Sequence, residues 1–162
     1  VIDCGSNHKL TSLDVSQNTL LRELDVNYNK IKAINVNNNK LLTILSCSSN
    51  QLKSLDLSKN KSLTQLSCIS NKLKILDVSK NADLTHLSCG ENKIKKLDIS
   101  KNISLNTLGC SDNKIKSLDV SKNTSLKRLY CRNNKLSSLD LRNNKALKYP
   151  SYKGNNFDKP LK

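Results

Sequence analysis

Cysteine offers the widest range of chemistry in this 162-residue chain, because a thiolate can ligate a metal, attack a substrate or form a disulfide. Five of the six cysteines follow one another at intervals of 21 residues, at Cys47, Cys68, Cys89, Cys110 and Cys131. Zinc sites need close pairs such as CxxC, and disulfide frameworks do not keep a strict period. Val26 stands one period before Cys47, at the same position of the repeat. Valine can replace cysteine only where the side chain serves packing. The spacing therefore predicts buried, free thiols that pack as small hydrophobic side chains.

The two histidines, His8 and His86, do not complete a catalytic site. A triad needs a serine or cysteine close to a base that a third group orients. The cysteines are predicted to point inward, and the serines recur as turn residues. The sequence thus predicts no catalytic residue, no cofactor and no metal site, and a protein that is not an enzyme.

Aspartate also recurs with the period, at Asp14, Asp56, Asp77, Asp98, Asp119 and Asp140. Carboxylates stacked at one strand spacing would repel one another. Lysines such as Lys74 and Lys80 flank Asp77, and we expect them to screen this repulsion. The pattern favours structural charge balance over metal binding.

The chain is strongly basic, with a net charge of +15 that comes from 24 lysines and 4 arginines against 13 acids. Such a charge attracts polyanions at low salt. Lysine is a strongly hydrated point charge, however, whereas arginine is the usual residue for bidentate phosphate recognition. The composition favours a solvated surface over a dedicated nucleic-acid reader. No apolar run approaches the roughly 20 residues that span a bilayer, so we expect no membrane insertion.

Asparagines repeat with the same period as the cysteines and mark two positions in each unit. The first set is Asn29, Asn50, Asn71, Asn92, Asn113, Asn134 and Asn155, and the second is Asn18, Asn39, Asn60, Asn81, Asn102, Asn123 and Asn144. Asn7 lies one residue out of step, which predicts an extra residue around His8 and Lys9. Residues 63–73 read LxxLxCxxNxL and residues 73–81 read LxxLxVxxN, so both halves of a unit share one skeleton.

This skeleton predicts the local structure of each half-unit. Alternation at Leu66 and Cys68, and again at Leu76 and Val78, is typical of a short strand with one buried face. The asparagine after each strand stands where the chain must turn inward, and its amide can bond backbone groups that the turn leaves unpaired. Stacked units would place these side chains in two polar ladders that flank the core.

The segment LxxLxCxxNxL resembles the conserved segment of leucine-rich repeats. With its 21-residue period and its periodic cysteine, the chain is similar to the internalin-J-like class of bacterial surface proteins over residues 2 to about 155. The resemblance implies a β-rich solenoid with a curved parallel sheet on the concave side, short strands or turns on the convex side, little or no helix, and an extracellular or cell-surface location. The helical N-terminal cap and the immunoglobulin-like module of internalins are not visible in the sequence, so no specific host partner follows from it.

Three outward positions flank the second leucine and the cysteine of each unit, and they vary along the array while the framework does not. The first column reads Val1, Glu23, Ile44, Gln65, His86, Thr107, Arg128 and Tyr149, and the second Asp3, Asp25, Ser46, Ser67, Ser88, Gly109, Tyr130 and Ser151. The third column includes Ile69 and Arg132. Such variation on one face is what a binding surface on a fixed scaffold requires.

Tyrosine and arginine often anchor protein interfaces, which makes Arg128, Tyr130, Arg132 and Tyr149 the first candidates for contact with a protein partner. Ile44, Ile69 and His86 are the weaker candidates in the same columns. The competing explanation is that the repeat degenerates at this end, where Pro150 replaces a leucine and Tyr152 replaces the cysteine. We expect a non-enzymatic module for protein recognition or adhesion, with a host protein among the candidate partners.

Lysines follow the first asparagine, follow the next leucine and precede the second asparagine. These three stripes are Lys30, Lys72, Lys93, Lys114 and Lys135; Lys32, Lys53, Lys74, Lys95 and Lys116; and Lys59, Lys80, Lys101 and Lys122. They allow a second hypothesis, in which glycans, nucleic acid or other polyanions bind through counterion release. The alternatives are a soluble face that prevents aggregation and a structural spacer of a larger surface protein.

The repeat predicts one domain, a leucine-rich-repeat array of about 7–8 coils of 21 residues over residues 1–155, with an irregular tail or partial cap at residues 156–162. Val1 to Cys4 read as the inside of a strand. Because solenoids need polar caps on their terminal coils, this start allows end-to-end or edge self-association.

Overall fold

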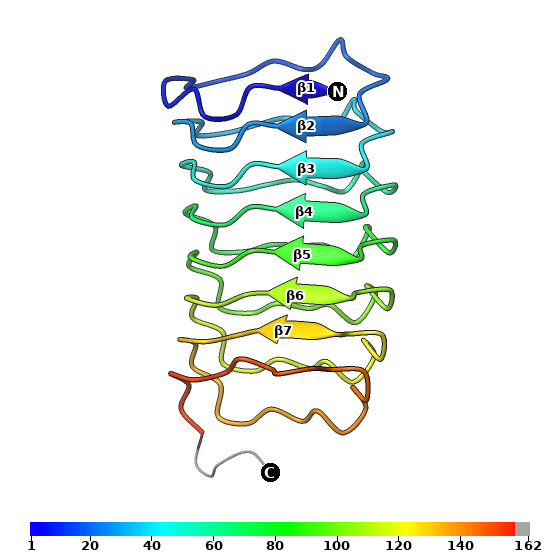
Figure 1. Cartoon of the computed structure of the whole chain (residues 1–162). Coiled ribbons are helices and arrows are strands. Elements are labelled where there is room, and N and C mark those ends of the chain that lie inside the picture. The colour runs from blue at the N-terminus through cyan, green and yellow to red at the C-terminus, as the bar shows by residue number, and fades with distance from the viewer. Residues whose placement is uncertain (158–162) are drawn as a thin grey trace.

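Short parallel strands, one from each coil, form the sheet that the sequence predicts. The computed structural model describes residues 1–157, in which the strands are β1 (Ile2–Asp3), β2 (Glu23–Asp25), β3 (Ile44–Ser46), β4 (Gln65–Ser67), β5 (His86–Ser88), β6 (Thr107–Gly109) and β7 (Arg128–Tyr130). Each strand pairs in parallel with its neighbours in sequence, so the coils stack in chain order (Figure 1). A single parallel bridge between Tyr130 and Ser151 adds the next coil. Residues 1–157 contain no helix, and hence none that could cross a membrane.

The register between strands follows the 21-residue period. Ile44 pairs with Gln65 and Gln65 with His86. Ile2 pairs with Leu24, which is an offset of one residue more, so the first coil holds the extra residue that the displaced Asn7 predicts. The outward columns read from the sequence are therefore aligned across the sheet.

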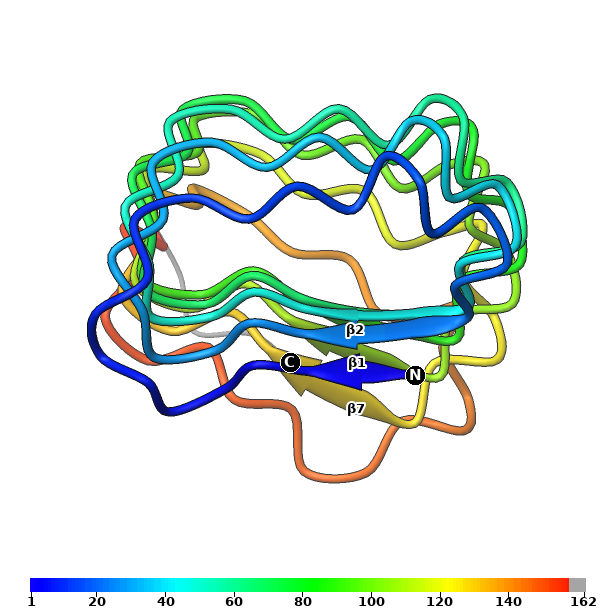
Figure 2. The same ribbon diagram turned by 90° about the horizontal axis from the view of Figure 1, so that it is seen from above.

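One continuous core fills the space between the sheet and the opposite side of each coil. Leu66 and Cys68 bury their side chains from the sheet side, and Leu73, Leu76 and Val78 bury theirs from the other side. Figure 2 shows this arrangement from above, with the strands on one side and irregular segments on the other. Because each coil repeats the same contacts, the core continues from coil to coil with no large central cluster.

The second half of each unit does not form the strand that alternation at Leu76 and Val78 predicts. Within residues 1–157, these segments contain no strand: in the unit of Leu76, residues 75–78 have no regular structure, between a bend at Lys74 and a turn at Ser79 and Lys80. The backbone N–H of Ser79 bonds the carboxylate of Asp77 at 2.9 Å, in a turn that takes the donor away from the neighbouring coil. The alternation correctly indicated burial on one face, but the side-chain turn replaces the ladder of a sheet.

The first asparagine ladder links each coil to the coil before it. The Nδ2 of Asn71 donates to the Cys68 carbonyl of its own coil at 3.2 Å and to the Cys47 carbonyl of the preceding coil at 3.0 Å. Its Oδ1 accepts the backbone N–H of Leu52 at 2.9 Å. The same bonding pattern recurs at Asn50, Asn92, Asn113 and Asn134. Each amide therefore satisfies buried backbone groups that would otherwise lack partners.

A left-handed residue precedes each asparagine of this ladder and turns the chain inward. The residues at this position of the repeat are Tyr28, Ser49, Ser70, Glu91, Asp112 and Asn133, with φ between 52° and 57°, and Gly154 at 75°. Side chains other than glycine are rarely found in this conformation. We infer that the asparagine bonds hold these turns against their intrinsic preference.

The last coil closes over the core with aromatic side chains. Tyr152 stands at the cysteine position of the repeat, and its ring lies edge-on to Phe157 with centroids 5.9 Å apart. Both rings, together with Leu147, pack against the core. Residues 158–162, the greater part of the expected tail, lie outside the described residues.

We predict that Asn71→Ala lowers the free energy of unfolding by about 2–4 kcal/mol, because the Leu52 N–H and the Cys47 carbonyl lose their buried partner. Urea denaturation followed by circular dichroism measures the change. Lys72→Ala, at the exposed neighbouring position, is the control and should change the value by less than about 0.5 kcal/mol. Equal losses in the free energy of unfolding for the two substitutions would show that the hydrogen bonds of Asn71 do not stabilise the fold more than an exposed side chain does.

Candidate binding surface

The outward side chains of β1–β7 and of the aligned residues 149–153 form one continuous surface, which we call the sheet face. The pairing of Thr107 with Arg128, and of Gly109 with Tyr130, places the columns side by side. Because backbone hydrogen bonds fix the strands, neighbouring outward side chains stand about one strand spacing of 4.8 Å apart. The sheet face is thus a rigid surface whose chemistry changes from coil to coil.

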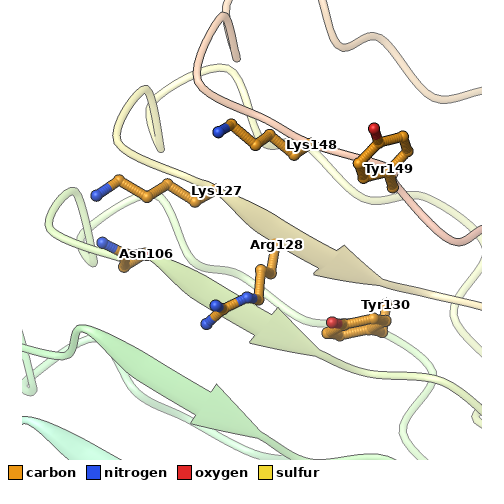
Figure 3. A pocket seen from close by; sticks show the side chains of 6 residues that line it. All are labelled: Asn106, Lys127, Arg128, Tyr130, Lys148 and Tyr149. Carbon is orange, nitrogen blue, oxygen red and sulfur yellow. The ribbon is translucent and has the colours of Figure 1, made fainter.

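A pocket of about 650 Å³ lies at the C-terminal end of the sheet face. Its lining residues come from three successive coils: Asn106, Lys127, Arg128, Tyr130, Lys148 and Tyr149. Figure 3 shows the Arg128 side chain extending from β7 over the neighbouring strand, with Tyr130 on one side and Lys127 on the other. The pocket combines three cations, two phenols and one amide.

Three of the four leading candidates line this pocket, namely Arg128, Tyr130 and Tyr149. Arg132 lies outside the lining, in the third column, where its Nε donates to the hydroxyl of Ser151. Tyr130 and Tyr149 are 46% and 95% exposed, so both rings are accessible to a partner.

Sequence reasoning missed Lys127, Lys148 and Asn106. These residues stand one position before the first outward column, where earlier coils carry threonines such as Thr64 and Thr85. The change from threonine to lysine along this fourth column was the available signal.

The weaker candidates lie away from the pocket, on coils nearer the N-terminus. Ile44 and Ile69 are half-buried, on the coils of β3 and β4. His86 is exposed on β5, and its Nδ1 lies 2.9 Å from the hydroxyl of Thr85. The structure therefore does not bring these three side chains together with the tyrosines.

Several side chains of the third column accept hydrogen bonds from the backbone of the next coil. Asn27 Oδ1 accepts the Ser48 backbone N–H at 2.7 Å, and Ser48 Oγ accepts the Ile69 backbone N–H at 3.1 Å. Ser111 Oγ receives the Arg132 backbone N–H at 3.1 Å. These side chains continue the sheet beyond the strand ends, so this column is less free to vary for binding than the other two.

The five periodic cysteines are buried, free thiols, as predicted, while Cys4 is half-buried. Burial raises the pKa of Cys47 and of Cys89 to about 12, and it raises the pKa of Cys68 and Cys110 in the same direction. A thiol with so high a pKa is a poor nucleophile at neutral pH. No group of three or more His, Cys, Asp or Glu residues within residues 1–157 is placed to hold a metal ion.

The aspartate column is stabilised mainly by hydrogen bonds and only secondarily by lysines. The Ser79 N–H bond is the largest cause that lowers the pKa of Asp77, and Lys80 contributes less. The same serine bond lowers the pKa of Asp14, Asp56, Asp98 and Asp119. The predicted screening by lysines thus named the smaller cause, because a turn places a backbone donor directly on each carboxylate.

Comparison with known proteins agrees with this architecture. The profile of the family described as Leucine Rich repeat matches residues 6–20 and 17–34. The functional domain of InlJ from Listeria monocytogenes, described as including a cysteine ladder, superposes with a TM-score of 0.96 at 40% identity over 99% of this chain. The chain is an internalin-like leucine-rich-repeat protein.

More distant solved structures share only the fold. The internalin InlF of Listeria monocytogenes gives a TM-score of 0.86 at 21% identity over 96% of this chain, and a leucine-rich-repeat protein of Leptospira interrogans gives 0.70 at 21% over 93%. This internalin-like chain spans 36% of the InlJ chain, 55% of the InlF chain and 48% of the Leptospira chain. A search of curated protein sequences finds no match.

We predict that a thiol reagent at pH 8 modifies Cys4 in the native protein while the five buried cysteines stay protected, because burial excludes the reagent and raises their pKa values. Absorbance at the end of the reaction counts the modified thiols. The control is the urea-unfolded protein, in which all six should react. Rapid modification of several thiols in the folded protein would contradict the buried ladder.

The ion pair between Asp140 and Arg142 makes the stability of the fold depend on pH. The Arg142 guanidinium, whose Nη2 lies 2.6 Å from Oδ2, lowers the pKa of Asp140 from 3.8 to about 2. A carboxyl group with a lowered pKa stabilises the fold above its unfolded pKa, and this stabilisation is lost as the pH falls through about 2. The deficit in thermal midpoint of Asp140→Asn relative to the parent should be present at pH 7 and vanish below pH 2.

Asp83→Asn is the control for this measurement, because Asp83 is exposed and its carboxylate makes no hydrogen bond within the described part of the chain. Its thermal midpoint should follow that of the parent at every pH. A deficit of Asp140→Asn that is constant down to pH 1.5 would show that the ion pair is not its source.

Proposed function

We propose that this chain is a non-enzymatic binding module that recognises a protein partner through the C-terminal end of its sheet face, as a secreted or surface-exposed bacterial protein. The observation that carries the proposal is the pocket formed by Arg128, Tyr130 and Tyr149 together with two lysines. Exposed tyrosines next to arginine are typical of interface anchors, since they offer a large rigid contact area and hydrogen-bonding groups.

The packing of the coils supports this proposal, because the side chains of the pocket do not take part in holding the coils together. The leucines, cysteines and asparagines hold the coils together. The side chains of Arg128, Tyr130 and Tyr149 make no hydrogen bond within residues 1–157, so substituting them should leave the fold intact. The similarity to internalins, which include Listeria proteins, supports a bacterial protein-binding role, with a host protein as one candidate partner.

The lysine stripes support a second candidate function, the binding of polyanions. Lysines of all three stripes are exposed, and the one salt bridge within residues 1–157 joins Arg142 to Asp140, so no stripe lysine lies within ion-pair distance of a carboxylate. The aspartate column offsets only part of the charge of the third stripe, Lys59, Lys80, Lys101 and Lys122. Polyanion binding of this type weakens steeply with salt, whereas a packed protein interface depends on it much less. A spacer of a larger surface protein would show neither kind of binding.

The deciding experiment is a pull-down of surface and serum proteins at low salt and at about 300 mM salt, with heparin and DNA as competitors. We expect a protein that is retained at the higher salt, is not displaced by the polyanions, and is lost with Tyr130→Ala. Tyr28→Ala is the matched control, because Tyr28 is 54% exposed but lies outside the strands. Capture that occurs only at low salt and is abolished by heparin would support the lysine stripes instead.

A further inference from the structure

The two ends of the sheet face carry opposite charges. Asp3, Glu23 and Asp25 project from β1 and β2, where Arg22 is the neighbouring base. At the other end stand the bases Lys127, Arg128, Arg132, Lys148 and Lys153. The outward residues of the strands between them include no Asp, Glu, Lys or Arg: Ile44, Ser46, Gln65, Ser67, His86, Ser88, Thr107 and Gly109. In a chain with 28 basic residues, this separation gives the face a direction.

The cations at the basic end have no carboxylate beside them and could bind an anionic group. Within residues 1–157, the side chains of Lys127, Arg128 and Lys148 make no hydrogen bond or ion pair, although all three line one pocket. The pocket has no carboxylate in its lining. Cations held together without a counter-charge repel one another, and an entering carboxylate relieves that repulsion while it gains charge-assisted hydrogen bonds.

Gly109 leaves the sheet surface open beside this pocket. It pairs with Tyr130, and a Cβ at this position would come no closer than 3.7 Å to the Ser88 side chain. Packing therefore does not require glycine here. A glycine inside a strand often marks a place where another backbone approaches closely.

We infer that the basic end of the sheet face takes an aspartate- or glutamate-rich segment of the protein partner, and that the acidic end fixes its direction by binding a basic group of the same segment. This inference rests on the proposed function and names the chemistry of the partner. The ends stand about five strand spacings apart, or about 24 Å. An extended segment covers that span with about seven residues.

A long polyanion fits this face less well, because it would run from the basic pocket onto Asp3, Glu23 and Asp25. A second copy of the chain could place its acidic end on the basic end in an antiparallel pair. The net charge of +15 on each copy opposes that association. Both alternatives are outcomes of the test below.

The test uses three labelled peptides and fluorescence anisotropy at about 150 mM salt. The first has the sequence Glu-Tyr-Glu-Glu, a Gly-Ser spacer of about eight residues, and three lysines. The second replaces the lysines with glutamine, and the third replaces the glutamates with glutamine. We expect the first peptide to bind several-fold more tightly than the second, and at least tenfold more tightly than the third.

Matched charge reversals assign the two ends. Arg128→Glu should weaken the first two peptides at least tenfold, while Lys95→Glu, the same charge change at an exposed lysine on the other side of the coil, should change both by less than twofold. Glu23→Lys should weaken the first peptide to the level of the second without weakening the second. Unchanged thermal midpoints would verify that the variants fold.

Four results would overturn the inference. Equal losses with Arg128→Glu and Lys95→Glu would show diffuse charge attraction only. Binding of a heparin oligosaccharide that Arg128→Glu abolishes, without binding of the acidic peptides, would assign the pocket to a glycan. A concentration-dependent dimer in sedimentation that Arg128→Glu dissociates would identify a second copy as the occupant. If Tyr130→Ala abolishes partner capture but Arg128→Glu does not affect it, this inference fails while the proposed function stands.

Discussion

The hydrogen bonds of the first asparagine ladder are the constraint on which the rest of the molecule depends. At every turn after a strand, the chain enters a left-handed residue and leaves backbone groups facing a dry interior. Asn71 satisfies carbonyls of two successive coils with one amide nitrogen, and its oxygen accepts an N–H from the preceding coil. Because an unpaired buried polar group costs about 1–3 kcal/mol, the coils cannot slide relative to one another without losing several such bonds. The ladder thereby fixes both the spacing and the register of the strands.

The second asparagine ladder is satisfied less completely. Asn81 donates to the Leu57 and Asn60 carbonyls of the preceding coil at 3.2 and 2.8 Å, but its Oδ1 has no partner within the described chain. The same holds for Asn39, Asn60, Asn102, Asn123 and Asn144. The sheet side, where both ends of each amide are bonded, is therefore the more tightly constrained side of the solenoid, and it is also the side that presents the pocket.

A fixed register allows the surface to vary without disturbing the core. Leu108 is fully buried, while its neighbours Thr107 and Gly109 face outward and are half-buried. The lysine stripes and the sheet face consequently form two distinct surfaces of one chain. The lysine stripes share the basic character of the whole chain, whose net charge is +15. The sheet face differs, because its two ends carry opposite charges.

The sequence by itself determined the strands, their order and their alignment, because a 21-residue period in leucine, cysteine and asparagine leaves one way to stack the coils. It also named the outward columns and the tyrosines in them. Only the tertiary structure decided how close Asn106 and Lys148 come to Arg128, since residues about one repeat apart in the sequence become neighbours only when coils stack. It likewise decided that Asp77 bonds the Ser79 N–H and that the second half-unit contains no strand. Hydrophobic alternation reports which side chains are buried, whereas the competition between a side chain and a neighbouring coil for one backbone donor is settled by three-dimensional geometry.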